Sequence, residues 1–238
     1  SKKVILCGDH VKNSFIAGAA VLMVANAVSK ILGAVFKIPL TYIVHEEGMA
    51  VYNTSFSVYV MFLSFIVSGM PFAVQKLTAV AYARGDAPRA KRTVIIATVI
   101  LAAAGIVGST ALWFGAEFFA LAMKEERAVW AIKALAPSVL FVALGTAVKS
   151  GFQGRSDMVP TAVSQVIEAA VKLAAGYAFA VWLADYGTRY AAAGAAAGVS
   201  VGELIATVML MIWYAASSKG GGICKAGKRE ISAGLLSI

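Results

Sequence analysis

Long apolar segments separated by short polar connections dominate the hydrophobic pattern of this chain. No charged side chain occurs between Gly48 and Gln75, or between Thr93 and Ala116. A membrane-spanning helix needs about 20 predominantly apolar residues, and both segments exceed that length. The pattern predicts six spans, at residues 13–37, 50–75, 93–116, 129–150, 159–184 and 190–216. Helices are expected because the hydrocarbon offers backbone groups no other partner and barrel-type alternation is missing.

Composition supports the same class, an all-α polytopic membrane bundle. Hydrophobic residues make up 60% of the chain and charged residues 14%, and mean hydropathy is +0.81. Soluble domains carry about 25% charged residues. The net charge of +9 would suit nucleic-acid phosphates, but the charges lie in short connections between apolar segments. The lipid bilayer is therefore the expected partner, and nucleic acid is not.

The distribution of basic residues predicts an orientation. Lys and Arg concentrate before the first span, after the second and fourth spans, and after the sixth: Lys2, Lys3, Lys12, Arg84, Arg89, Lys91, Arg92, Lys149, Arg155, Lys219, Lys225, Lys228 and Arg229. The other three connections, at 45–48, 124–127 and 185–189, are acidic or mixed. The positive-inside rule places both ends of the segment in the cytoplasm, and an even number of spans agrees.

Three features of the spans stand out. Gly33 with Pro39, and the sequence Ser-Gly-Met-Pro at 68–71, predict interruptions of the first and second spans. Each is either a packing kink or the lining of a cavity. Gly194, Gly198 and Gly202 recur every four residues and permit close approach of a second helix. Packing within the bundle is favoured over a contact between molecules.

Residues 1–218 are expected to form one six-helix lobe, and 219–238 a basic cytoplasmic linker that leads into a further apolar helix. The two cysteines, Cys7 and Cys224, lie near predicted cytoplasmic ends, so no disulfide is expected. Metal-ligand spacing, a nucleophile elbow and a phosphate-binding glycine loop are missing from the sequence. We therefore expect no metal, no cofactor and no enzymatic activity.

Among the charged residues inside the predicted spans, five stand out: Lys30, Lys37, Glu168, Lys172 and Glu203. Each costs roughly 2.5–3.5 kcal/mol on insertion scales, so such residues are functional candidates. Glu168 and Lys172 have the spacing of an intrahelical ion pair, which would be structural. Lys37 alternatively extends to the interface.

Polar residues of the same spans extend this set. They are Asn26, Ser29, Asn53 and Gln165, although any of them can instead bond a neighbouring helix. If all these groups face one cavity, three lysines outweigh two glutamates, and an anionic phosphate or pyrophosphate group fits there. Glu168 or Glu203 is then a candidate for binding a coupling H⁺ or Na⁺.

Several segments, in this order, are similar to the stage V sporulation protein B group of the MOP superfamily of polysaccharide and lipid II flippases. The segments are SKILG at 29–33, FKIPL at 36–40, YN at 52–53, FLS at 62–64, SGMPFAVQKL at 68–77, ARGD at 83–86, GFQGR at 151–155 and MVPTAVSQVIE at 158–168. The resemblance covers most of residues 11–216.

This resemblance implies a two-lobed transporter in the bacterial cytoplasmic membrane that works by alternating access. The implied cargo is an undecaprenyl-pyrophosphate-linked saccharide, either a peptidoglycan precursor or another envelope unit. Lys30 and Lys37 match basic residues important in the family, but lysine in place of arginine does not give a bidentate grip on pyrophosphate. The chain supplies one lobe, so a second lobe of the same polypeptide or a second copy is an expected partner.

Two other functions stay open from the sequence. A MATE-like exporter of drugs or metabolites, coupled to a cation, would depend on Glu168 and Glu203 rather than on the lysines. A non-transporting membrane scaffold in envelope assembly would use the glycines at 194, 198 and 202 as a contact surface.

Overall fold

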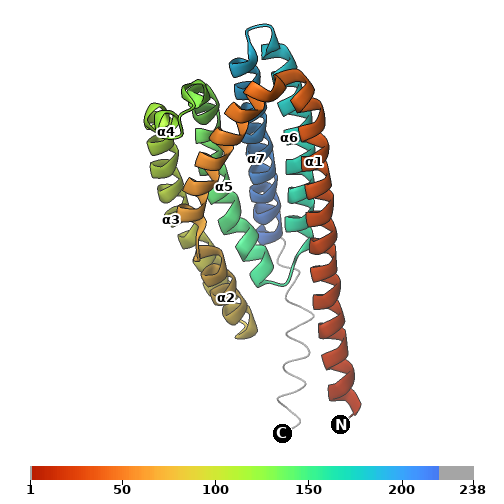
Figure 1. Ribbon diagram of the computed structural model, residues 1–238. Helices are drawn as coiled ribbons and strands as arrows, with labels where there is room; N and C mark the ends of the chain where they lie inside the picture. The colour runs from red at the N-terminus through yellow and green to blue at the C-terminus, as the bar shows by residue number, and fades with distance from the viewer. Residues whose placement is uncertain (1, 220–238) are drawn as a thin grey trace.

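The computed structural model describes the backbone of residues 2–219 and the side chains of residues 18–217. The predicted linker beyond Lys219 and both cysteine side chains lie outside those ranges. The described chain is helical and contains no β-strand, which confirms the predicted all-α membrane bundle. Its helices are α1 (Lys2–Val67), α2 (Met70–Ala83), α3 (Ala87–Phe114), α4 (Ala116–Ala122), α5 (Val129–Gly154), α6 (Val159–Ala184) and α7 (Thr188–Lys219), with a 3₁₀ turn, η1, at Glu126–Ala128 (Figure 1).

Helix α1 folds back on itself and supplies two legs of the bundle. Its only non-helical residue is His45, with φ 55° and ψ −176°, a backbone conformation that non-glycine residues rarely adopt. We call residues 2–44 the first leg and 46–67 the second leg; Figure 1 shows them running in opposite directions. The loop expected between the first two spans is therefore a sharp kink. Gly48 permits it, because a Cβ there would collide with the Val44 side chain.

The two predicted interruptions have different outcomes. The first is wrong: α1 keeps helical geometry through Gly33 and Pro39, since membrane helices accommodate proline when neighbouring groups satisfy the freed backbone. The second is present. Helix α1 ends at Val67, Gly69 adopts φ 75°, and α2 begins with proline in its first turn, where the missing N–H costs nothing.

Five helices of residues 18–217 are long and apolar enough to cross a membrane, with Gly18–Ala83 counted as one. Large apolar side chains cover the outside of the bundle, for example Phe65 at 81% and Phe114 at 84% exposure. The interior instead holds many small residues, including Ala131, Ala192 and Ala195. This distribution suits hydrocarbon as the surrounding solvent, because packing rather than water exclusion joins helices in a membrane.

Helices α6 and α7 pack through glycine. A Cβ on Gly198 would overlap the backbone of Gly176, and one on Gly194 would lie 2.6 Å from the Phe179 carbonyl oxygen. A Cβ on Gly202 would lie 2.9 Å from the Glu168 carbonyl oxygen. The expectation that this glycine series packs within the bundle is confirmed. This close approach also fixes the distance between the charged residues that α6 and α7 carry.

Candidate functional site

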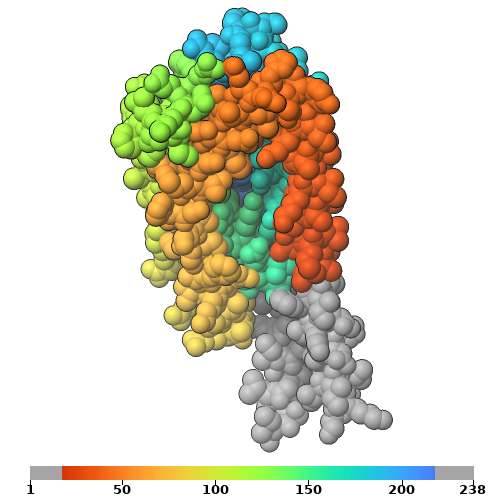
Figure 2. All heavy atoms as spheres, in the orientation of Figure 1, coloured from red at the N-terminus to blue at the C-terminus, as the bar shows by residue number. Residues whose placement is uncertain are grey.

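A cavity of about 290 Å³ lies between α1, α5, α6 and α7. In Figure 2 the two legs of α1 stand apart, and parts of α5, α6 and α7 are visible in the hollow between them. The cavity is lined by Asn26, Ser29, Gly33, Phe36, Val142, Lys149, Gln165, Glu168, Ala169, Lys172 and Glu203. We call it the charged pocket. It collects most of the intramembrane polar residues predicted as candidates.

The ion pair of the charged pocket joins α5 to α6. Lys149 Nζ lies 3.4 Å from a Glu168 carboxylate oxygen, and the two side chains are 22% and 25% exposed. The predicted pair was Glu168 with Lys172, one turn along the same helix, and no such pair is present among the described residues. Lys149 reaches Glu168 from another helix, so neither side chain has to fold back along the surface of its own helix to form the pair.

Lys149 is not among the predicted site residues, because the sequence groups it with the basic residues at the cytoplasmic end of the fourth span. Helix α5 continues to Gly154, so Lys149 lies about 7 Å from the helix end at about 1.5 Å per residue. The signal for this longer helix was available. Gly151, Phe152 and Gly154 are small or apolar and buried, and polar turn residues begin only at Arg155.

Lys172 contacts an aromatic ring rather than a carboxylate. Its Nζ lies 5.2 Å from the centroid of the Phe56 ring on the second leg of α1. The face of an aromatic ring attracts cations, and most strongly where water is scarce. The Phe56 ring is itself stacked on Tyr52 with 6.0 Å between centroids. This contact links α6 to the second leg and holds the ammonium beside the cavity.

Glu203 is the most buried carboxyl group of the pocket, at 9% exposure on α7. It lies within electrostatic range of Glu168, Lys149 and Lys172. Two lysines and two glutamates line the charged pocket, so its formal charge is balanced. The predicted excess of positive charge is not a property of this cavity.

The remaining polar lining comes from α1 and α6. Ser29 Oγ donates a hydrogen bond to the main-chain oxygen of Gln165 at 3.1 Å. The side-chain Oε1 of Gln165 is buried and has no hydrogen-bond partner among the described residues. Asn26 lines the cavity from a largely exposed position. The pocket thus presents acceptor oxygens as well as charges.

Three predicted candidates lie outside the pocket lining. Lys30, Lys37 and Asn53 are exposed, each one residue after a side chain that faces inward. Each of these lysines still lies about one helical turn from a residue that does line the pocket, Lys30 from Asn26 and Gly33, and Lys37 from Gly33. Of Lys30, Lys37 and Lys172, which were expected to share one cavity, only Lys172 lines it. The binding roles of Lys30 and Lys37 stay predictions, for an exposed face of α1.

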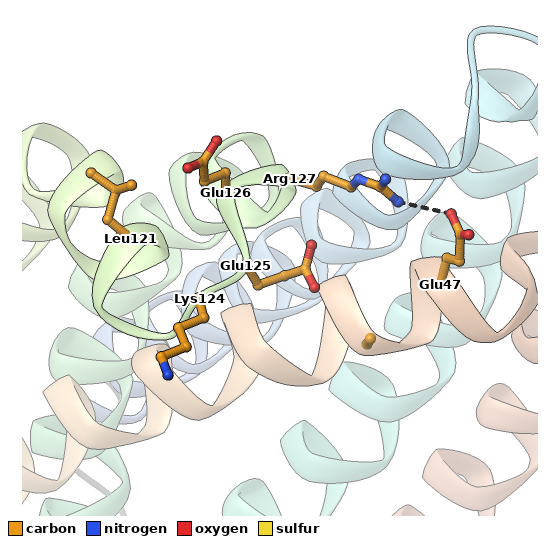
Figure 3. A pocket seen from close by; sticks show the side chains of 7 residues that line it. Glu47, Leu121, Lys124, Glu125, Glu126 and Arg127 are labelled. Atoms are coloured by element: carbon orange, nitrogen blue, oxygen red, sulfur yellow. Dashed lines mark hydrogen bonds and ion pairs between the residues drawn. The ribbon is translucent and has the colours of Figure 1, made fainter.

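A second charged hollow lies at the opposite end of the bundle from α2. It is lined by Glu47, Ala50, Leu121, Lys124, Glu125, Glu126 and Arg127. Figure 3 shows Arg127 reaching toward Glu47 of α1, with 2.8 Å between the guanidinium and the carboxylate. These two side chains are 58% and 72% exposed, so the pair contributes little to stability. It connects η1 to the start of the second leg.

These features define a multi-pass helical membrane protein with a charged pocket inside one bundle. Residues 15–232 match the polysaccharide biosynthesis protein family. The chain belongs to that family, and its resemblance to the stage V sporulation protein B group is confirmed.

Three curated relatives come from Bacillus subtilis (strain 168). Stage V sporulation protein B is 28% identical over 204 residues, covering 85% of this chain and 39% of the relative. The uncharacterized membrane protein YabM is 30% identical over 201 residues, covering 83% and 37%. Lipid II flippase MurJ is 28% identical over 170 residues, covering 68% and 31%. The chain therefore spans less than two fifths of the length of these relatives.

Solved structures share the fold at low identity. A MATE protein in complex with MaL6 superposes with a TM-score of 0.67 at 16% identity, over 83% of this chain and 46% of the MATE chain. An inward-facing multidrug resistance MATE family transporter of the MOP superfamily gives a TM-score of 0.67, over 83% of this chain and 48% of the other. These likenesses show that the chain has the fold of part of a MATE transporter.

Proposed function

We propose that this chain is one lobe of a flippase that moves an undecaprenyl-pyrophosphate-linked saccharide across the bacterial cytoplasmic membrane. The observation that carries the proposal is the charged pocket, which lies inside an apolar bundle and between the legs of α1. Ionic groups are costly in hydrocarbon and mark transport pathways. The family relationship, and the name of the relative lipid II flippase MurJ, favour a lipid-linked cargo over a small solute.

The cargo's pyrophosphate is assigned to the exposed lysines of α1. Lys30 and Lys37 lie on its first leg seven residues apart, and both are exposed. An ammonium binds phosphate as a point charge. Lys172 reaches the cavity behind them, and Asn26, Ser29, Asn53 and Gln165 offer hydrogen bonds to the head group. The cargo is moved without chemical conversion, so these residues bind and release it.

Alternating access needs a second body against which this lobe moves. That body is a second lobe of the same polypeptide or a second copy of the chain. Glu168 and Glu203 line the pocket and are the candidates for coupling to H⁺, Na⁺ or membrane potential. The basic end of the bundle is assigned to the cytoplasm by the positive-inside rule.

The test is flipping of a fluorescent undecaprenyl-pyrophosphate-linked sugar by the full-length protein in proteoliposomes. We expect Lys30→Ala and Lys37→Ala each to slow flipping about tenfold or more, because a hydrogen bond to a charged group contributes about 1.5–3 kcal/mol. The control is Lys76→Ala, which removes an exposed lysine from α2. Normal flipping by both α1 variants would remove these lysines from the mechanism.

An exporter of small cations is the second candidate. Buried Glu203 on α7 favours it, because a carboxylate binds a cation or a proton. Dye efflux by the full-length protein separates the two functions: an exporter extrudes the dye and loses that activity in Glu203→Gln, whereas a flippase extrudes none. A protein that does neither, but co-purifies with an envelope synthase, would favour the scaffold function.

A further inference from the structure

Partly buried charges of opposite sign are matched within the charged pocket. Lys149 and Lys172 stand against Glu168 and Glu203, all lining one cavity. A carboxylate withdrawn from water must be neutralised by a proton, a metal cation or a fixed ammonium. In this pocket the closest described cation to a carboxylate is the Lys149 ammonium, at 3.4 Å from Glu168. The protein therefore carries its own counter-charge.

The two lysines are not equivalent. Lys172 Nζ lies over the Phe56 ring, at 5.2 Å from its centroid. Lys149 alone makes an ion pair within the described part of the pocket, and it also acts electrostatically on Glu203. Removing the Lys149 charge would leave Glu168 without its ion-pair partner. The Lys172 contact would stay, because it depends on a ring from a different helix.

Without the Lys149 ammonium, the two carboxylates would share the cavity with Lys172 alone, whose ammonium lies over the Phe56 ring. Gln165 lines the same cavity, and its buried Oε1 is an acceptor with no hydrogen-bond partner among the described residues. Carboxylate and amide oxygens suit hard cations. The described residues hold no cluster of three or more metal-ligating His, Cys, Asp or Glu side chains. An oxygen-lined hollow of this kind suits a monovalent ion once the ammonium is gone.

We propose that Lys149 is the tethered counter-cation of the charged pocket, and that its ammonium takes the place of a bound metal ion. The pocket itself then binds no Na⁺. If the chain is a transporter lobe as proposed, it follows that this lobe couples transport to protons or membrane potential rather than to Na⁺. Only that consequence rests on the proposed function. Its test needs no cargo, so a failure of the flippase proposal leaves the result readable.

The experiment is equilibrium binding of radioactive Na⁺ to the full-length protein in nanodiscs, in a mildly alkaline buffer that limits competition by protons. We expect Lys149→Met to gain a further saturable Na⁺ site relative to the unmodified protein. Lys149→Arg, which keeps the charge, should gain none. The double variant Lys149→Met with Glu168→Gln should lose the gained site. No gain in Lys149→Met would overturn the proposal.

The chain offers a matched control on the same helix. Lys133 also lies 3.4 Å from a carboxylate, that of Glu117, whose side chain is 74% exposed. Water hydrates that carboxylate when the lysine is removed, so Lys133→Met should gain no Na⁺ site. A gain equal to that of Lys149→Met would mean that loss of any lysine suffices, and would overturn the proposal.

A further variant keeps the proposal testable if Lys149→Met does not fold. Glu168→Gln on its own removes a carboxylate while Lys149 stays in place. We expect it to bind as much Na⁺ as the unmodified protein, because no Na⁺ occupies the pocket. A loss of Na⁺ binding in Glu168→Gln would show that the pocket already holds the ion, and the proposal would be wrong.

Discussion

Single hydroxyl side chains join α7 to α5. Ser200 Oγ donates to the Ala134 carbonyl oxygen at 2.6 Å, and Thr207 Oγ1 donates to the Phe141 carbonyl oxygen at 2.9 Å. Both hydroxyls are buried. If the helices separated within the membrane, the hydrocarbon would offer these hydroxyls no water to bond. Side-chain bonds between membrane helices contribute about 0.6 kcal/mol on average, because the separated helices find other partners.

Loss of the Ser200 hydroxyl should cost the protein a small, measurable amount of stability. We expect Ser200→Ala to lower the free energy of unfolding by about 0.5–1.5 kcal/mol, measured by denaturation of the purified protein in mixed micelles. The control is Ser57→Ala, since the exposed Ser57 hydroxyl bonds only its own helix at Asn53. An equal loss in both variants would indicate that the contact between helices contributes nothing.

The intramembrane charges show what a sequence says about single residues. Each of Glu168, Lys172 and Glu203 was recognised as a candidate because its cost in hydrocarbon does not depend on the fold. The partner of Glu168 could not be derived in that way. It is Lys149, nineteen positions earlier on α5, and the packing of both α5 and α6 against α7 brings the two together.

Among the elements, α6 and α7 make the closest backbone approach. A Cβ on Gly198 would overlap the Gly176 backbone, and one on Gly176 would meet the Phe36 ring of α1 at 2.9 Å. This approach places Lys172 and Glu168 of α6 beside Glu203 of α7. The four-residue repeat predicted a packing face, since glycine at that period is sterically permissive. The four-residue repeat does not specify that the partner of this face is α6; the chain connectivity and the packing of the whole bundle decide that.

Enlarging Gly198 should separate these two helices. We expect Gly198→Ala to destabilise the protein by about 1–3 kcal/mol, the usual cost of inserting a methyl group into a packed interior. A thermal-shift assay in detergent measures the change. Gly33→Ala is the matched control, because a Cβ at Gly33 in α1 meets nothing within 4 Å and alanine favours a helix. If Gly198→Ala were as stable as Gly33→Ala, the contact would not be tight in the membrane.

Helix α1 is the element that sequence reasoning placed least well. A polar stretch of acidic character predicts a loop, but His45 turns the chain within one residue and the helical hydrogen bonding resumes at once. Pro39 predicts a break, but α1 stays helical there. Local preferences cannot decide between these two positions. The kink at His45 depends instead on the close fit of Gly48 against Val44, a contact that forms only once the chain has turned.

For the whole molecule, the two ends of the bundle differ in charge. One end carries α2, the α5–α6 turn and the end of α7 (Figure 1). It holds Arg84, Arg89, Lys91, Arg92 and Arg155. The other end carries the α1 kink, α4 and the α6–α7 turn (Figure 1), and its charges are acidic or mixed. The positive-inside rule assigns the basic end to the cytoplasm.

This orientation predicts which connections a membrane-impermeant thiol reagent reaches. In a variant without its natural cysteines, Asp185→Cys in the α6–α7 turn should be labelled in intact cells. Asp86→Cys, before α3, should be labelled only after the membrane is permeabilised. Both aspartates are exposed, so burial does not account for a difference. The reverse labelling pattern would invert the proposed topology.

The sequence by itself determined the environment of this protein, the position of most spans and the identity of its costly charged residues. Those properties follow from the transfer of each side chain from water to hydrocarbon, which is local and additive along a helix. Tertiary structure decided which charges share a cavity. Lys149 joined the pocket, and Lys30 and Lys37 remained on the exposed face of α1. That outcome depends on how helices rotate and cross, which the close packing of distant glycines and alanines sets for the bundle as a whole.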